Sequence, residues 1–334
     1  MRILVIGGTN FIGPYVVKRL LQKGHQVAVF NRGKTKKVQF HEVQHIQGDR
    51  NRFFEHVDNI KKFSPDVVLD MFPYTQRDAQ LVMDTCKGLT QRVVALSSLD
   101  VYRAYGIFRR LEEGDLEPVP LKESAPLRSS MYPYRGIDES LYHYEKILVE
   151  QTVLGEQELP GTILRLPMVY GPEDDRHRTF EYVKRMADQR PYIILEEEAA
   201  HWSWTRGYVE NVAEAIVLAT TDVRASGKIY NVGEVPSFTL REWVLEIAKI
   251  FEWKGEMMVL PKERLTQSFI YPYEMKQDIV IDTSLIRKEL GYAEVVDRKT
   301  ALKKTMTWEL NHPPKDYEWD YEREDQLVKG HSPT

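Results

Sequence analysis

The chain has 334 residues, and its 46 Lys and Arg against 50 Asp and Glu give a formal net charge of −4. This length suits one large domain or two closely packed ones, and the near-balanced charge argues against a nucleic-acid-binding surface. A single cysteine, Cys86, excludes an intramolecular disulfide framework and fits a reducing compartment. The first predicted strand begins at residue 2, and no apolar run approaches the ~18 residues of a membrane span. We therefore expect a cytoplasmic protein.

The first 32 residues predict a strand, a glycine-rich turn, a helix and a second strand. Residues 3–6 form an uninterrupted apolar run, which is typical of a parallel strand buried on both faces. The turn GGTNFIG follows at residues 7–13, with Asn10 where a glycine is usual, and apolar residues then recur at helical spacing. Glycine lets the backbone approach a pyrophosphate at the start of a helix, and Asn tolerates left-handed backbone angles. The unit predicts dinucleotide binding.

The end of the second strand indicates which dinucleotide is bound. NAD-binding proteins usually place an acidic residue there to hold the ribose, whereas a basic residue can contact a 2′-phosphate. This chain has no acid at that point and carries Arg32 and Lys34. We therefore predict NADP over NAD, with both residues as phosphate contacts; a solvated basic loop is the alternative.

Strands and helices continue to alternate along the chain. Strands are predicted at 43–46, 66–70 and 92–97, and helices at about 51–62 and 77–88. This alternation predicts an α/β, Rossmann-like, doubly wound parallel sheet whose ligands lie at the carboxyl ends of the strands. Asp49 follows the third strand and could contact the adenine amino group, and Ser98 ends the fifth strand near the expected nicotinamide pocket.

A tyrosine and a lysine supply the candidate acid-base chemistry. Residues 138–154 have helical character, so Tyr142 and Lys146 are expected one turn apart on one helix face. An ammonium group beside a phenol lowers the tyrosine pKa from about 10, which makes the phenol a usable acid or base near neutrality. A hydroxyl such as that of Ser98 could orient the same substrate oxygen. Such pairs are also frequent on helix surfaces.

Taken together, these stretches resemble the extended short-chain dehydrogenase/reductase superfamily, the NAD-dependent epimerase/dehydratase family. The resemblance covers roughly residues 1–310 and rests on GGTNFIG, the Gly48-Asp49 pair, SSLDVY, YHYEKILVE, LRLPMVYGP, YVENVAEAI and KIYNVGE. It implies that Ser98, Tyr142 and Lys146 form a catalytic triad in which Tyr142 moves a proton while hydride passes to or from the nicotinamide. The cofactor contacts that it implies, with those predicted above, are Gly7, Thr9, Asn10, Phe11, Ile12, Gly13, Arg32, Lys34, Asp49, Arg50, Met71, Leu96, Tyr142, Lys146 and Pro167.

Several departures from the family pattern reduce the number of candidate reactions and substrates. Dehydratases of the family carry an Asp-Glu pair where this chain has Leu99 and Asp100, which argues against dehydration and leaves epimerisation or carbonyl reduction. The family arginine that holds a substrate pyrophosphate aligns with Trp204, and the nearest cation is Arg206. Between Ser98 and the YHYEK segment lies a long insert that could cover the pocket or elaborate the surface.

A second lobe is expected to bind the substrate. Arg176, His177, Arg178 and Arg206 could form an anion pocket, because guanidinium groups suit phosphate or carboxylate, although solvated surface charge is the alternative. No metal site is predicted from two isolated histidines, His177 and His201. The predicted units are an NAD(P)-binding domain (1–172 and 207–235), a discontinuous substrate lobe (173–206 and 236–312) and a tail (313–334) that packs on the lobe or on a partner.

The sequence therefore favours an NAD(P)-dependent epimerase or reductase that acts on a nucleotide-sugar or another anionic sugar. One alternative is an NADP-dependent reductase of a non-sugar ketone, suggested by Trp204 and the aromatic Phe72 and Tyr74. Another is a dinucleotide- or RNA-binding protein without turnover, since GGTNFIG also resembles the loop of the atypical chloroplast stem-loop-binding branch. The preferred reading involves a small-molecule substrate, no nucleic acid and no membrane, and the resemblance alone suggests a homodimer.

Overall fold

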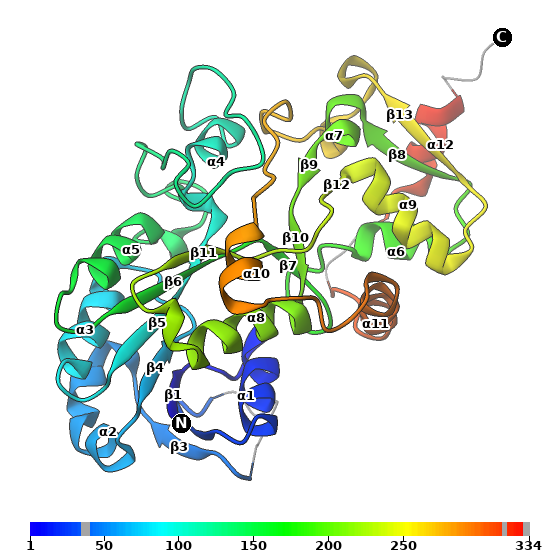
Figure 1. Cartoon of the computed structure of the whole chain (residues 1–334). Helices are drawn as coiled ribbons and strands as arrows, with labels where there is room; N and C mark the ends of the chain where they lie inside the picture. The colour runs from blue at the N-terminus through cyan, green and yellow to red at the C-terminus, as the bar shows by residue number, and fades with distance from the viewer. Residues whose placement is uncertain (35–40, 316–318, 330–334) are drawn as a thin grey trace.

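A parallel seven-stranded sheet forms the centre of the larger lobe (Figure 1). The computed structural model describes residues 1–34, 41–315 and 319–329. The strand order is β11-β6-β5-β4-β1-β2-β3, and all neighbouring pairs are parallel. The bounds are β1 Arg2–Ile6, β2 Gln26–Asn31, β3 Gln44–Gln47, β4 Val67–Asp70, β5 Arg92–Ser98, β6 Gly161–Leu166 and β11 Ile229–Asn231. The predicted Rossmann-like fold is confirmed.

Helices cover both faces of this sheet, which explains the continuous apolar run of β1. α1 (Ile12–Gln22) and α8 (Val209–Thr221) pack on one face with α10 (Ser284–Leu290), and α2 (Val57–Phe63), α3 (Gln76–Cys86) and α5 (Lys146–Gly155) pack on the other (Figure 1). Successive side chains of a strand point to opposite faces. Ile3 and Val5 therefore join the first layer, and Leu4 and Ile6 join the second.

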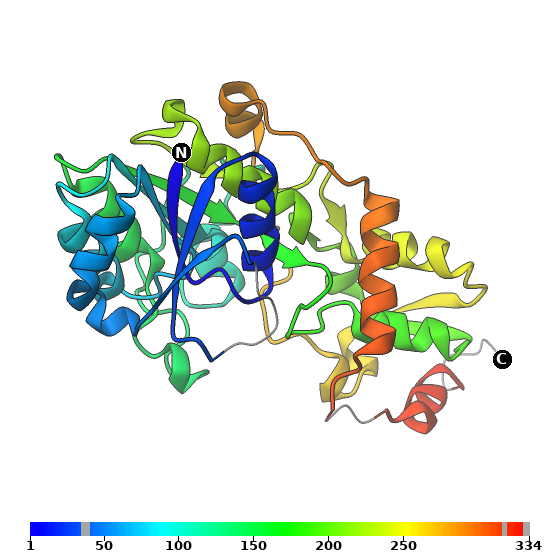
Figure 2. The same ribbon diagram turned by 90° about the horizontal axis from the view of Figure 1, so that it is seen from below.

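The second lobe combines short helices with small two-stranded sheets. Its helices are α6 (Phe180–Ala187), α7 (Glu197–His201), α9 (Leu240–Phe251), α11 (Arg298–Asn311) and α12 (Tyr321–Lys329). β8 (Tyr192–Glu196) pairs with β13 (Glu256–Leu260), β9 (Ser203–Trp204) with β12 (Phe238–Thr239), and β7 (Met168–Tyr170) with β10 (Arg206–Tyr208). The described part of the C-terminal tail packs on this lobe (Figure 2), because Val328 is buried against Ile194 and Leu260.

The long insert joins the two lobes. It begins with α4 (Arg103–Phe108) and continues as largely irregular chain to the 3₁₀ turn Glu139–Leu141. Phe108 stacks on Trp202 of the second lobe with ring centroids 4.9 Å apart, and Leu121 bridges to Ile281. The insert is therefore part of the packed structure and not a separate surface elaboration.

The prediction of one helix over residues 138–154 is wrong, because α5 begins only at Lys146. Glu145 is extended, with φ −156°, and its carboxylate caps the helix by accepting from the Ile147 amide at 3.0 Å. The same carboxylate accepts from the Arg128 guanidinium at 2.9 Å and from the Tyr132 amide at 2.6 Å. These contacts with the insert hold Glu145 outside the helix. Tyr142 and Lys146 therefore do not share a helix face.

Candidate functional site

Two adjoining cavities open at the carboxyl ends of the sheet strands. The first, of about 300 Å³, lies beyond β2 and β4 and is lined by Arg32, Lys34, Asp49, Arg50 and Asp78, among others. The second, of about 630 Å³, is lined by residues 7–13 together with Met71, Leu96, Ser98, Tyr144, Lys146, Pro167 and Arg178. Both include Gly7, Thr9, Arg32, Phe72 and Tyr74. The two cavities thus form one elongated site along the glycine-rich turn.

The glycine-rich turn has the geometry that close backbone approach requires. Gly7 has φ +102°, and a Cβ on Gly13 would lie 2.5 Å from the Gly8 carbonyl carbon. The Gly13 amide donates to the Asn10 carbonyl at 2.9 Å, so the turn closes with Asn in place of the usual glycine. Phe11 supplies no side-chain cap for α1. First-turn amides of this helix can therefore serve an anion in the second cavity.

The first cavity contains the residues predicted to hold the adenosine end. Arg32 and Lys34 line it, and the Asn31 side chain accepts from the Gly33 amide at 2.7 Å. Asp49 also lines it, while its side chain accepts from the Asn51 amide at 2.9 Å. The Arg50 guanidinium is paired with Asp70 at 2.7 Å and with Asp78 at 3.1 Å, so its charge is balanced within the protein.

Ser98 and Lys146 lie together in the second cavity, as predicted. Lys146 is buried, and its Nζ donates to the carbonyl oxygens of Pro73 at 2.7 Å and Leu96 at 2.9 Å. Burial lowers the pKa of Lys146 to about 8. Ser98 is the last residue of β5, and its Oγ accepts from the Asp100 amide at 3.2 Å.

Tyr142 does not join these two residues. Its side chain is 43% exposed, and its ring lies 4.7 Å from the Arg135 guanidinium. It lines a neighbouring groove beside the start of α3, which Tyr144 also borders, but it does not line the second cavity. Tyr144 lies in the second cavity in its place, with the Lys146 ammonium 5.6 Å from its ring centroid. The segment YHYEK contains both tyrosines, and only the extended backbone before α5 decides which one faces the cavity.

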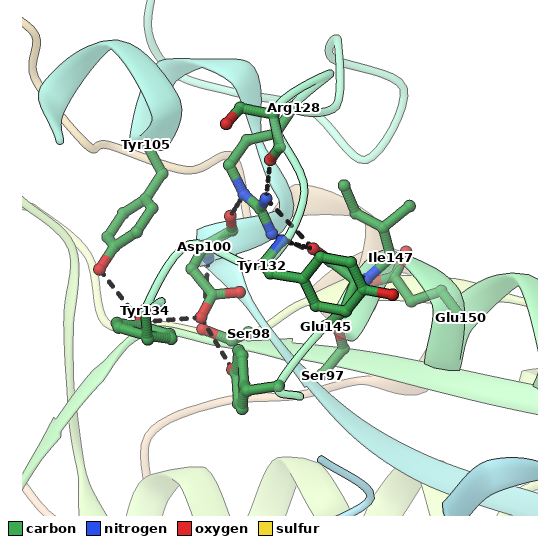
Figure 3. Close-up of polar contacts among 12 residues, drawn as sticks. Ser97, Ser98, Asp100, Tyr105, Arg128, Tyr132, Tyr134, Glu145, Ile147 and Glu150 are labelled. Carbon is green, nitrogen blue, oxygen red and sulfur yellow. Dashed lines mark hydrogen bonds and ion pairs between the residues drawn. The ribbon is translucent and has the colours of Figure 1, made fainter. Parts of the chain in front are cut away.

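A buried carboxyl group lies behind Tyr144, and sequence reasoning assigned it no role. Asp100 is 2% exposed, and its Oδ2 accepts from the Tyr144 hydroxyl at 2.8 Å. The same oxygen accepts from the Tyr134 hydroxyl at 3.0 Å (Figure 3). Tyr134 also lies within hydrogen-bond distance of Tyr105 at 3.1 Å, and both of these tyrosines come from the insert. Burial raises the pKa of Asp100. The pKa of Tyr144 is also raised, mainly by burial and in addition by the nearby Asp100 charge.

Two buried ion pairs hold the elements around this cluster. Arg128 pairs with Glu145 at 2.9 Å, and both side chains are fully buried. Arg165 of β6 pairs with Glu150 of α5 at 2.7 Å, and Glu150 also accepts from the Ser97 hydroxyl at 2.6 Å. Ser97, Ser98, Glu145 and Glu150 are all seen in Figure 3. These contacts set the position of the start of α5 relative to the end of β5.

The structure does not bring the four predicted anion-binding residues into one pocket. His177 contacts Glu309 at 2.6 Å and stacks on Trp308. Arg178 pairs with Asp174 but lines the second cavity. Arg206 is 5% exposed and stacks on the Trp243 ring at 4.7 Å, whereas Arg176 is exposed.

Trp204, at the position of the expected arginine, is packed among aromatic rings. Its ring centroid lies 4.7 Å from Trp202, 5.6 Å from Phe108 and 6.5 Å from Tyr105. Trp204 is therefore part of the junction between the insert and the second lobe and adds no cation there.

Across the described ranges, no three His, Cys, Asp or Glu side chains are grouped so that they could hold a metal ion. Within the same parts of the chain, no helix combines the length and apolar character needed to cross a bilayer.

Known proteins resemble this chain at low sequence identity. The chloroplast stem-loop binding protein of 41 kDa b from Arabidopsis thaliana is 22% identical over 244 residues, covering 69% of this chain but only 58% of that protein. A UDP-glucose 4-epimerase from Haemophilus influenzae is 23% identical over 348 residues, covering 94% of this chain and 98% of the epimerase. The solved dTDP-glucose 4,6-dehydratase from Bacillus anthracis, in complex with NAD, has a TM-score of 0.69 at 18% identity and covers 93% of this chain and 97% of its own.

The family assignment depends on a match that spans most of the sheet and the site. The profile of the NAD dependent epimerase/dehydratase family matches residues 3–233, which include the glycine-rich turn, Ser98, Lys146 and β11. This chain therefore belongs to the NAD-dependent epimerase/dehydratase family.

Proposed function

We propose that the protein is an NAD(P)-dependent enzyme that transfers hydride at a carbinol or carbonyl carbon of a nucleotide-sugar or similar anionic sugar. The observation that carries this proposal is that Ser98, Lys146 and a tyrosine phenol line the same cavity as residues 7–13. These are the groups needed to orient a substrate oxygen and to exchange a proton with it.

The residues present fit a dinucleotide. Gly13 has no room for a Cβ, the adjoining cavities extend along the turn, and the α1 amides favour a pyrophosphate. A bound nicotinamide cofactor would supply the hydride donor or acceptor. Lys146 would hold the ribose next to the nicotinamide, and Ser98 would donate to the substrate oxygen.

Arg32 and Lys34 favour NADP in this proposal, because they line the adenosine end and no acidic residue ends β2. The dehydratase of similar fold contains NAD, which makes the comparison of the two cofactors the first experiment. Titration with NADH and NADPH, followed by nicotinamide fluorescence, should show tighter NADPH binding. Arg32→Ala should weaken the binding of NADPH by about tenfold relative to the binding of NADH, since one phosphate contact is lost. Equal NADH and NADPH affinities would contradict the NADP preference.

A second candidate function is the NADP-dependent reduction of a non-sugar ketone. The packing of Trp204 against Trp202, Phe108 and Tyr105 favours it, because the expected grip on a substrate pyrophosphate is absent at that position. Thermal unfolding with UDP, UDP-glucose or a short 3-oxo acid separates the two candidates. Stabilisation by UDP and UDP-glucose supports the function with a nucleotide-sugar substrate. Stabilisation by the oxo acid alone supports the reduction of a non-sugar ketone. NADPH oxidation with the same compounds tests turnover.

A further inference from the structure

We propose that Tyr144, and not Tyr142, donates the proton in this site and that the Asp100 carboxyl group replenishes it. This inference rests on the proposed hydride-transfer function. It assigns the proton-donor role to Tyr144, although the sequence favoured Tyr142, which lies four residues before Lys146. Tyr144 lies only two residues before Lys146.

The position of Tyr144 is set by the residue that follows it. Arg128 and the Tyr132 amide hold the Glu145 carboxylate, so the chain enters α5 in an extended conformation. Tyr144 is 8% exposed and lines the cavity that also contains Ser98 and Lys146. Tyr142 lines the neighbouring groove beside the start of α3 and stacks on Arg135. A proton donor must reach the reacting oxygen directly or through one water molecule, and Tyr144 is the phenol of YHYEK that lines this cavity.

The surroundings of Asp100 favour a protonated carboxyl group. Its Oδ1 has no hydrogen-bond partner among the residues that the structure describes, and its Oδ2 accepts from the two phenols of Tyr144 and Tyr134. The nearby cations are committed elsewhere, because Arg128 is paired with Glu145 and Lys146 donates to two carbonyl groups. An ionised carboxylate without a cationic partner is costly to bury.

Protonation of Asp100 changes what Tyr144 can do. An ionised Asp100 accepts the Tyr144 hydrogen, which is then not available to a substrate. A protonated Asp100 instead donates to the Tyr144 oxygen, and the phenol hydrogen is free to point into the cavity. Ser98 lines the same cavity as this phenol.

In carbonyl reduction, the substrate oxygen receives one proton from Tyr144, and Tyr144 regains one from Asp100. As hydride reaches the carbonyl carbon, the Tyr144 O–H bond breaks and its proton forms a new O–H bond on the substrate oxygen. The phenolate then takes the proton of Asp100 across the 2.8 Å contact. Asp100 is left as a carboxylate that accepts from Tyr134 and Tyr144, and it regains a proton from solvent after product release.

A matched pair of variants tests the tyrosine assignment. Tyr144→Phe should lower the turnover of NADPH with the active carbonyl compound by at least about 100-fold while cofactor affinity is retained. Tyr142→Phe should stay within about twofold of the wild type. The reverse pattern, or equal activity in the two variants, overturns the inference. A wild type that binds NADPH but reduces none of the carbonyl compounds would instead overturn the proposed function.

Infrared spectroscopy tests the proton on Asp100 without any substrate. The difference spectrum of wild type minus Asp100→Asn near pH 7 should contain the stretching band of a protonated carboxyl group, shifted in D₂O. Other buried carboxyl groups cancel in this difference. Absence of the band overturns the role of Asp100. The pH profile of turnover should lose its fall at high pH in Asp100→Asn, which a purely structural role of Asp100 would not produce.

Discussion

The two ends of the site are built in different ways. One end depends on the glycine-rich turn, a contiguous segment: residues 7–13 connect β1 directly to α1, and all of them line the second cavity. The reacting end combines the end of β5, tyrosines of the insert and the start of α5. A local backbone motif thus determines the first, and buried pairs between distant segments determine the second.

Removal of Arg128 should cause the largest loss of stability and turnover, because it disturbs the end of the site that contains Tyr144. Arg128→Ala leaves Glu145 buried and without its cationic partner, which costs about 3–5 kcal/mol. We expect a lower free energy of unfolding in urea and loss of turnover, since Tyr144 is no longer held in the cavity. Arg135→Ala is the matched control, because Arg135 is exposed, stacks on Tyr132 and Tyr142 and donates to the Tyr142 carbonyl oxygen at 3.1 Å without pairing with Glu145. Equal losses of stability and turnover in the two variants would show that the buried Glu145 carboxylate does not need Arg128 as its cationic partner.

A side chain at Gly13 should damage the cofactor end by a smaller amount. The Cβ of Gly13→Val would meet the Gly8 backbone at 2.5 Å, so α1 must move away from the turn. We expect a loss of about 1–3 kcal/mol in stability and at least tenfold weaker NADPH binding in fluorescence titrations. Gly155→Ala at the end of α5 is the control, because its Cβ would meet open space. Unchanged NADPH affinity in Gly13→Val would place the dinucleotide elsewhere.

The smallest expected effect is the pH dependence of stability due to Lys146. Its pKa in the folded protein, about 8, lies below the ordinary lysine value of 10.5. Between these values the unfolded chain binds more protons than the folded one, so this side chain favours folding increasingly as pH rises. Below about pH 8 both states are protonated and the burial cost is complete. Wild type should therefore gain stability relative to Lys146→Met between pH 8 and 10, as measured by urea unfolding; parallel curves would contradict the lowered pKa.

Much of the fold could be predicted because its signals are local. The apolar run of β1 requires cover on both faces, and the strand–turn–helix order leads to a parallel sheet. Similar local chemistry sets the start of α9, where Thr239 and Glu242 form a capping box. That box places the start of the helix at Leu240.

The sequence by itself determined the sheet, the glycine-rich turn and the presence of Ser98 and Lys146 at one end of the sheet, since each depends on residues adjacent in the chain. Only the tertiary structure decided that Tyr144 faces the cavity, that Asp100 lies behind it and that the four predicted anion-binding residues are dispersed. The reason is physical: Arg128, 17 residues before Glu145, binds its carboxylate and prevents the helix from starting earlier. Helical periodicity carries no information about such a long-range pair.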